Sequence, residues 1–224
     1  MAPVAHSFRL LAAVLAIVSL QCAAAPFAIQ VGDTRIGLDA PSGFSDTLFT
    51  GSPRLQEAAE SMTSPSNRVL LFALSDGDLR RFTQGETPDL KRFMVASTPK
   101  EFEREGVTAG AFGRLSAELL RDGGPPAGDA NYLAFLDNQT PGKARTLAEL
   151  ARQSGLTSLL LGTRLPSLKS NEKPQYLLST SSLLLVRGRA VHLAVYAGYE
   201  SPADVEWIRN VTARWIEDLK RLNR

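Results

Sequence analysis

The most regular pattern of apolar and polar positions lies in the last quarter of the chain. Residues 190–199 alternate between two sets of side chains with a period of two, which is the spacing of a β-strand. Residues 177–186 alternate less strictly and end in the apolar run 183–186, which indicates a strand covered on both faces. Gly188, between two arginines, accepts the positive φ of a tight turn. The pattern therefore predicts a long hairpin.

A helix is predicted directly after this hairpin. Ser201 is a suitable N-cap, Pro202 suits the first helical position, and Asp204 places a carboxylate at the positive end of the helix dipole. Apolar residues then recur every three or four positions, at Val205, Ile208, Val211, Trp215, Leu219 and Leu222. Packing of this stripe on the strands is the main interpretation, and a partner-binding amphipathic helix is the alternative.

The remaining pattern predicts further strands and helices. Strands are expected as a hairpin over 27–38 and at 68–74, 90–97 and 157–165. Helices are expected over 53–62 and over 146–153, and one helix or a broken helix from a Thr98 cap to about residue 121, with 76–82 either helical or a loop. Together they predict an α+β fold with a mostly antiparallel sheet flanked by helices, an α/β/α sandwich, with the long C-terminal helix packed on the sheet.

The first residues have the features of a cleaved secretory signal. One positive charge, Arg9, precedes an apolar run over 10–20 that is shorter than the ~20 residues of a membrane span, and small residues follow. We expect cleavage between Ala24 and Ala25, a periplasmic or secreted protein, and no membrane span in the mature chain. Lipidation at Cys22 is a less favoured alternative, because Gln21 fits a lipoprotein signal poorly.

The mature chain is expected to form one globular domain, over residues 25–224. The loop over 122–129 is interpreted as an intradomain loop, because the segments on either side are short for separate cores. All 23 acidic residues and 24 of the 25 basic residues lie past the leader, so the mature chain carries 24 − 23 = +1. A balance so close to neutral gives no indication of nucleic-acid binding.

Few residues suited to catalysis or metal binding follow the leader. Cys22 and His6 both lie within it, which leaves a mature chain with no thiol and one histidine, His192. Disulfides, cysteine nucleophiles, thiolate zinc sites and multi-histidine metal sites are therefore excluded, and no cofactor is expected. Neither a phosphate-binding glycine loop nor a nucleophile elbow is present. His192 lies in mid-strand, where a hydrogen-bonded structural histidine is favoured over a catalytic base for a serine.

Three other groups of side chains have a functional and a simpler interpretation. Carboxylates within 100–105 form either a general acid/base pair or a solvated helix face, which is favoured. The cations Arg80, Arg81, Lys91 and Arg92 form an anion-binding patch if the fold gathers them, and otherwise are dispersed surface charges. The aromatic residues that line a small-molecule pocket between helix and sheet, or simply fill the core, are Tyr196, Tyr199, Trp207 and Trp215.

The order of elements resembles a known fold. The N-terminal hairpin leaves through Pro41-Ser42-Gly43-Phe44, and a helix that begins Ser201-Pro202-Ala203-Asp204 and carries two tryptophans closes the chain. This arrangement resembles the PsbP-like α/β/α sandwich of the photosystem II extrinsic subunit, the Mog family of Ran-binding proteins and small exported bacterial proteins. The resemblance implies a non-enzymatic accessory or binding protein, and no functional residue of those families matches a position here.

The sequence therefore predicts a non-catalytic accessory or binding module that takes an envelope protein or a small ligand. The alternative is a cofactor-independent hydrolase in which His192 activates a serine.

Overall fold

The computed structural model describes residues 27–128, 131–167 and 173–224. Its strands are β1 Ala28–Val31, β2 Thr34–Gly37, β3 Phe44–Asp46, β4 Asn67–Ser75, β5 Arg92–Pro99, β6 Arg145–Gln153, β7 Leu156–Arg164, β8 Tyr176–Val186 and β9 Arg189–Gly198. Its α-helices are α2 Pro53–Ser61, α3 Asp76–Thr83, α4 Ala109–Gly123, α5 Tyr132–Asp137 and α6 Pro202–Leu222, and its short 3-10 helices are Leu48–Thr50 and Lys100–Phe102.

Seven of the strands form one sheet in the order β3-β4-β5-β9-β8-β7-β6, and every neighbouring pair is antiparallel. The predicted hairpin is confirmed as its centre: β8 and β9 pair from Leu177↔Gly198 to Val186↔Arg189. Their two-residue turn has positive φ at Arg187 (48°) and at Gly188 (75°), the conformation that matches the twist of the strands.

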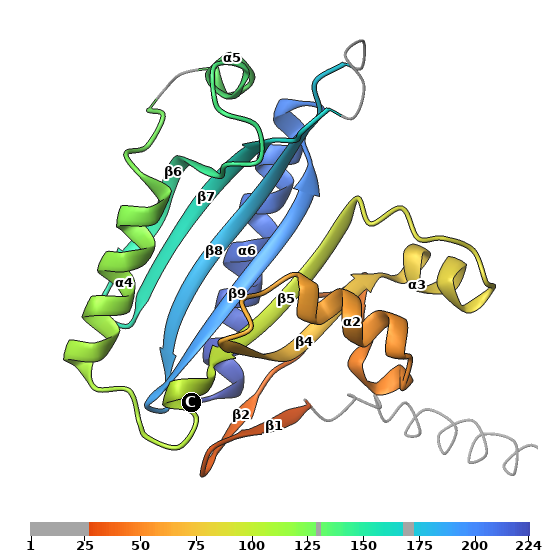
Figure 1. Ribbon diagram of the computed structural model, residues 1–224. Coiled ribbons are helices and arrows are strands. Elements are labelled where there is room, and N and C mark those ends of the chain that lie inside the picture. The colour runs from red at the N-terminus through yellow and green to blue at the C-terminus, as the bar shows by residue number, and fades with distance from the viewer. Residues whose placement is uncertain (1–26, 129–130, 168–172) are drawn as a thin grey trace, which may run out of the picture.

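Helices cover both faces of this sheet, which confirms the predicted α+β sandwich. Figure 1 shows α6 behind the strands and α2, α3 and α4 in front of them. On the α6 face the helix stripe packs with Leu178, Val191 and Val195 in the largest core cluster. On the other face α2 packs on β4 and β5, and α4 packs near the β8–β9 turn.

The long C-terminal helix forms as predicted. Its start is held by Asp204, whose carboxylate accepts a hydrogen bond from the Ser201 backbone N–H at 3.0 Å. Five of the six stripe residues are buried and Leu222 is half-buried. Its end is tied to the small β1–β2 hairpin, because the Asn223 side chain donates to Gly37 O at 2.7 Å and accepts from Gly37 N at 2.9 Å. The helix therefore spans the full length of the sheet.

The prediction of a helix over 146–153 is wrong, because this segment is strand β6. Two irregularities in its pairing with β7, between Thr146 and Ala148 and between Glu149 and Ala151, each insert one extra residue. An inserted residue places side chains of one face three positions apart instead of two, which imitates the spacing of a helix. The same bulges twist this edge of the sheet, and β3 at the other edge is only three residues long, so both edges are poor templates for strand addition.

The predicted helix start at Thr98 is also wrong. Thr98 is buried at the end of β5, and its hydroxyl donates to Ala190 O at 2.8 Å instead of capping a helix. A 3-10 turn follows, and α4 begins only at Ala109, where the Thr108 hydroxyl accepts from Ala111 N at 3.2 Å. The interpretation left open for 76–82 resolves as helix α3, which Ser75 caps. Strand β3 and helix α5 were not predicted.

Candidate functional site

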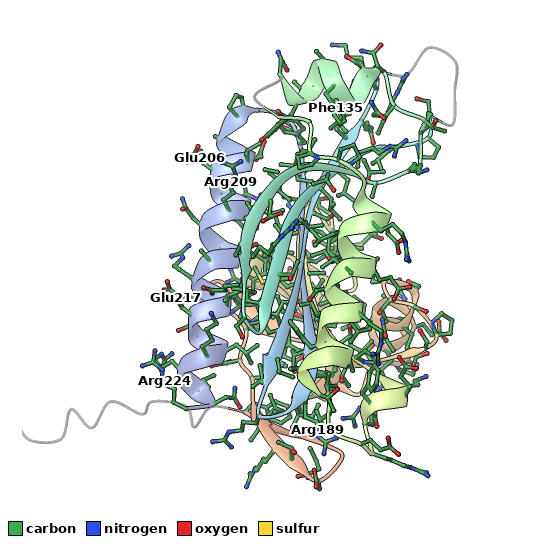
Figure 2. All side chains as sticks on the ribbon, turned by 90° about the vertical axis from the view of Figure 1, so that its left-hand side faces the viewer. Phe135, Arg189, Glu206, Arg209, Glu217 and Arg224 are labelled. Atoms are coloured by element: carbon green, nitrogen blue, oxygen red, sulfur yellow. The ribbon has the colours of Figure 1, made fainter. Side chains whose placement is uncertain are left out.

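A groove of about 490 Å³ runs between α6 and the last two strands of the sheet. It exists because α6 packs mainly on β8 and β9, while β7 and β6 continue the sheet beyond it. Figure 2 shows this side of the molecule, with the β6 edge of the sheet between α6 and α4. The groove is therefore the place where the closing helix leaves part of the sheet face open.

The floor of the groove is apolar. It consists of Leu150 and Ala151 from β6, Leu156 from β7, and Ala213 and Ile216 from α6. Leu156 and Ile216 are buried, and Leu150 and Ala151 are half-buried at the edge of the main core. A groove of this volume, with an apolar floor and polar side chains around it, has the character of a small-molecule site.

Two buried hydroxyl pairs lie at the inner wall of the groove. Ser158 bonds to Ser182 at 2.7 Å, and Thr212 of α6 bonds to Thr180 at 2.9 Å. All four residues are buried, and each hydroxyl has its partner within the protein. The polar character that a ligand meets therefore comes from the rim and not from these hydroxyls.

Arg209 is the half-buried cation of the rim. Its Nη2 donates to the hydroxyl of Tyr132, at the start of α5, over 3.3 Å. Its Nε is closed off from solvent without an acceptor, and no described carboxylate lies within 4.0 Å of its guanidinium. A guanidinium cannot lose its proton, so this residue carries a full charge that described residues leave unneutralised.

The other charges of the groove lie elsewhere along its rim. Glu149 pairs with Arg152 at 2.6 Å, and Arg152 lines the α4 side of β6. Glu217 and Lys220 lie farther along α6, eight and eleven residues from Arg209, which places Glu217 roughly 12 Å away at 1.5 Å per residue. In Figure 2, Arg209 and Glu217 are separated along α6 in this way. Among the α6 residues that line the groove, Arg209 is therefore the one charged side chain at this end.

A second cleft, of about 540 Å³, lies between α2 and the start of β4. Its two cations are already engaged: Arg68 pairs with Glu103 at 2.8 Å, and Lys100 donates to Pro65 O at 2.8 Å. The pairing of Glu103 with Arg68 also favours the simpler interpretation of the carboxylates in 100–105, because this carboxylate balances a cation. The α6 groove is the better candidate, since no carboxylate in the described part of the chain pairs with its guanidinium.

The structure brings His192 together with a serine. Ser181 Oγ lies 2.6 Å from His192 Nε2, on the sheet face opposite α6. Burial lowers the pKa of His192 from 6.5 to about 4, so the imidazole is neutral at pH 7 and weakly basic. No described carboxylate bonds to its other nitrogen, and β8 is paired on both sides of Ser181, which leaves its ladder N–H groups occupied. The contact therefore lacks an orienting acid and an oxyanion hole.

Three of the four cations considered for an anion-binding patch do come together. They line one polar hollow of about 520 Å³ near the starts of α3 and α6, which Arg80 does not line. Each has a carboxylate partner, in the pairs Arg81–Asp89 at 2.8 Å, Lys91–Glu200 at 3.8 Å and Arg92–Asp204 at 3.2 Å. The hollow is therefore neutralised by its own residues.

The four aromatic residues do not gather in a pocket between helix and sheet: Tyr199 and Trp215 are buried in the main core. Trp215 is 1% exposed and donates from Nε1 to Asp39 O at 2.8 Å. Tyr196 lies on the opposite face of the sheet, stacked on Phe93 at 4.5 Å. Trp207 is half-buried under the Arg92 guanidinium, 4.1 Å from its ring centroid. These contacts favour packing over ligand binding, as the simpler interpretation held.

Several expectations concern residues outside the described part of the chain. The proposed leader over 1–24, its cleavage site between Ala24 and Ala25, and Cys22 all belong to residues 1–26. Within the described residues, no helix has both the length and the hydropathy needed to cross a membrane. The same residues contain no cluster of three histidine, cysteine, aspartate or glutamate side chains arranged around a possible metal.

Comparison with known proteins adds little. No protein-family model matches the chain, and no curated protein does. A solved structure, the Ran-binding protein Mog1p of Saccharomyces cerevisiae, is similar over 89% of this chain and 93% of that chain, at 12% sequence identity and a TM-score of 0.35. A likeness at this level assigns neither a family nor a function.

Arg209 was not singled out by the sequence. It follows Ile208 at the border of the apolar stripe, where arginines are common on helices that pack against a sheet. Arg209 is distinguished only by the tertiary structure. Two strands of the sheet continue past α6, and the described residues leave the charge of Arg209 unpaired.

Proposed function

We propose that this protein is a binding module that holds a small amphipathic ligand in the groove between α6 and β6–β7. The observation that carries this proposal is a groove of about 490 Å³ with an apolar floor and, on its rim, a half-buried arginine that no carboxylate of the described residues pairs with. Of the two partner classes expected from the sequence, an envelope protein and a small ligand, the groove favours the small ligand.

Two properties of the groove support this proposal: its floor offers apolar surface, and its buried hydroxyls are already hydrogen-bonded within the protein. The partly exposed floor loses contact with water when an apolar ligand covers it, which stabilises the complex by roughly 25 cal/mol for each Å² removed from water. The inner hydroxyls are paired with one another, so they do not require a ligand with matching donors. The ligand's body should therefore be apolar and its polar group should lie at the rim.

The groove is tested with an uncharged apolar probe and a variant that fills it. N-phenyl-1-naphthylamine should bind with increased fluorescence, and decanol should displace it. Ala213→Trp places an indole over the floor and should abolish the signal, whereas Ala203→Trp, another exposed alanine of α6 outside the groove, should not. Equal binding by both variants and the unmodified protein would exclude this groove as the site.

We also propose export, with cleavage between Ala24 and Ala25. The support is the sequence pattern of the first residues alone. Intact-mass measurement of protein recovered from the periplasm should give a chain that begins at Ala25. A mass that matches a diacylated Cys22 would instead establish a lipoprotein.

A hydrolase has one observation in its favour, the 2.6 Å contact between Ser181 and His192. A base with a pKa of about 4 and no acid partner is poorly matched to activating a serine at neutral pH. We therefore expect the protein and its Ser181→Ala variant to hydrolyse p-nitrophenyl acetate at the same background rate. Saturable turnover that disappears in Ser181→Ala and in His192→Ala would reverse the order of the two candidates.

A further inference from the structure

We infer that the ligand of the groove is a monoanionic amphiphile, a carboxylic acid whose head group binds Arg209 and whose apolar chain lies over the floor toward Ile216. This inference rests on the proposed groove function and adds the chemical class and the orientation of the ligand. It follows from the position of Arg209 at one end of an otherwise apolar floor.

The first argument is the hydrogen-bonding state of Arg209. A guanidinium offers five N–H groups, and among the described residues this one uses only Nη2, on Tyr132. Its Nη1 has no described partner, and its half-buried position removes part of the hydration that an exposed arginine keeps. A planar carboxylate matches the guanidinium with two parallel hydrogen bonds, which a hydroxyl or an ammonium group does not.

The second argument is the number of charges. Arg209 is the cation at its end of the groove, because Lys220 lies eleven residues farther along α6. One guanidinium neutralises one negative charge. A phosphate monoester, with a charge of about −1.5 to −2 at pH 7, would retain excess charge against an apolar floor. A carboxylate leaves the groove neutral at this end.

The third argument is direction. Past Arg209 the groove is lined by Ala213 and Ile216 before it reaches Glu217 and Lys220 at its far end. Over the roughly 12 Å between Arg209 and Glu217, α6 lines the groove with Asn210, Thr212, Ala213 and Ile216, and the Thr212 hydroxyl is already paired with Thr180. None of these four side chains is charged, so this stretch suits an unbranched apolar chain and not a second charged group. The Tyr132 hydroxyl accepts a hydrogen bond from the guanidinium on the α5 side, away from this stretch.

The test compares three probes of equal chain length by isothermal titration: decanoate, decanol and decylamine. We expect decanoate to bind about tenfold tighter than decanol or more, as charge-assisted hydrogen bonds imply, and decylamine to bind more weakly than decanol. Arg209→Met should reduce decanoate affinity to that of decanol and leave decanol unchanged. Arg209→Lys, which keeps the charge but loses the paired geometry, should fall between them.

The control is Arg214→Met, which removes an exposed arginine of the same helix outside the groove and should leave all three affinities unchanged. Urea midpoints and circular dichroism establish that each variant is folded. If decanol and decanoate bind equally and Arg209→Met changes neither, the head-group inference fails while the groove function stands. If Ala213→Trp leaves every affinity unchanged, the groove function fails as well. Equal loss in Arg214→Met would show non-specific attraction and overturn the inference.

Discussion

Two arginines at opposite ends of the sheet show how differently one residue type is used. Arg189, at the β8–β9 turn, is 4% exposed, yet its Nε, Nη1 and Nη2 all have partners. The acceptors are the Thr34 hydroxyl, the carboxylate of Asp33, and the backbone carbonyls of Phe102, Glu103 and Glu105 at 3.1, 3.1 and 2.9 Å. This guanidinium joins the β1–β2 turn, the segment before α4 and the central hairpin.

Arg209, toward the α5 end in Figure 2, has one described partner at 3.3 Å and a buried Nε without an acceptor. The fold supplies a complete set of acceptors where an arginine holds three segments together. It supplies almost none where an arginine borders an apolar groove. The charge of Arg189 is therefore part of the fold, whereas the described residues leave the charge of Arg209 without a counter-ion.

Replacing Arg189 should have the largest effect on stability. Arg189→Met keeps much of the apolar stem but leaves three carbonyls without their charged donor, so we expect a loss of about 3 kcal/mol in the free energy of unfolding. Urea denaturation measures it. Arg214→Met, at an exposed arginine of α6 with one hydrogen bond of 3.4 Å to Asn210 O, should change stability by about 0.5 kcal/mol or less. A loss below 1 kcal/mol for Arg189→Met would break the contrast between the two arginines.

His192 provides the second test, because its polar group is satisfied by a single partner, Ser181. Its pKa is about 4 in the folded protein and 6.5 in the unfolded chain, because burial disfavours the imidazolium. Between these values the unfolded chain binds more protons, so stability rises with pH. Lowering the pH from 7 to 5 should therefore remove about 1–2 kcal/mol.

The matched variant for this pH effect is His192→Gln, which retains a hydrogen-bonding group but cannot titrate. Its unfolding free energy should lack the share of the slope between pH 7 and pH 5 that His192 contributes. A slope identical to that of the unmodified protein would mean that His192 is protonated in the folded state or does not control acid stability.

The sequence predicted the elements whose patterns are local. The β8–β9 hairpin and α6 were predicted because alternation, Gly188, and the Ser201 and Pro202 cap act within a few residues of each other. Strand β6 was missed because its two bulges shift the phase of the side chains, and a bulge is decided by the neighbouring strand. Thr98 was mistaken for a cap because its actual partner, Ala190 O, lies 92 positions away.

The candidate site was harder to predict than the fold. Arg80, Arg81, Lys91 and Arg92 were considered for their charge, but whether charges attract a ligand depends on their partners, and Arg81, Lys91 and Arg92 proved to be paired. For Arg209 the sequence shows an ordinary helical arginine. Its unpaired state depends on where α6 crosses the sheet, which no short stretch of sequence specifies.

Breaking the hydrogen bond between Ser158 and Ser182, at the inner wall of the groove, should lower the free energy of unfolding by an intermediate amount. Ser182→Ala leaves the Ser158 hydroxyl, which is fully buried, without its partner at 2.7 Å, so we expect a loss of about 1–2 kcal/mol. Adding Ser158→Ala removes the orphaned group, so the double variant should recover part of that loss. A double variant less stable than either single variant would show that cavity formation, and not the missing hydrogen bond, dominates at this position.

The smallest effect is expected for Arg209→Met measured without ligand. The substitution is the same as at Arg189, yet here it removes a single long hydrogen bond and relieves a half-buried, unneutralised charge. The two contributions oppose one another, and the unfolding free energy should stay within about 0.5 kcal/mol of the unmodified protein or rise slightly. A loss approaching that of Arg189→Met would mean that the fold neutralises Arg209 after all, and the groove would then have no charge to offer a ligand.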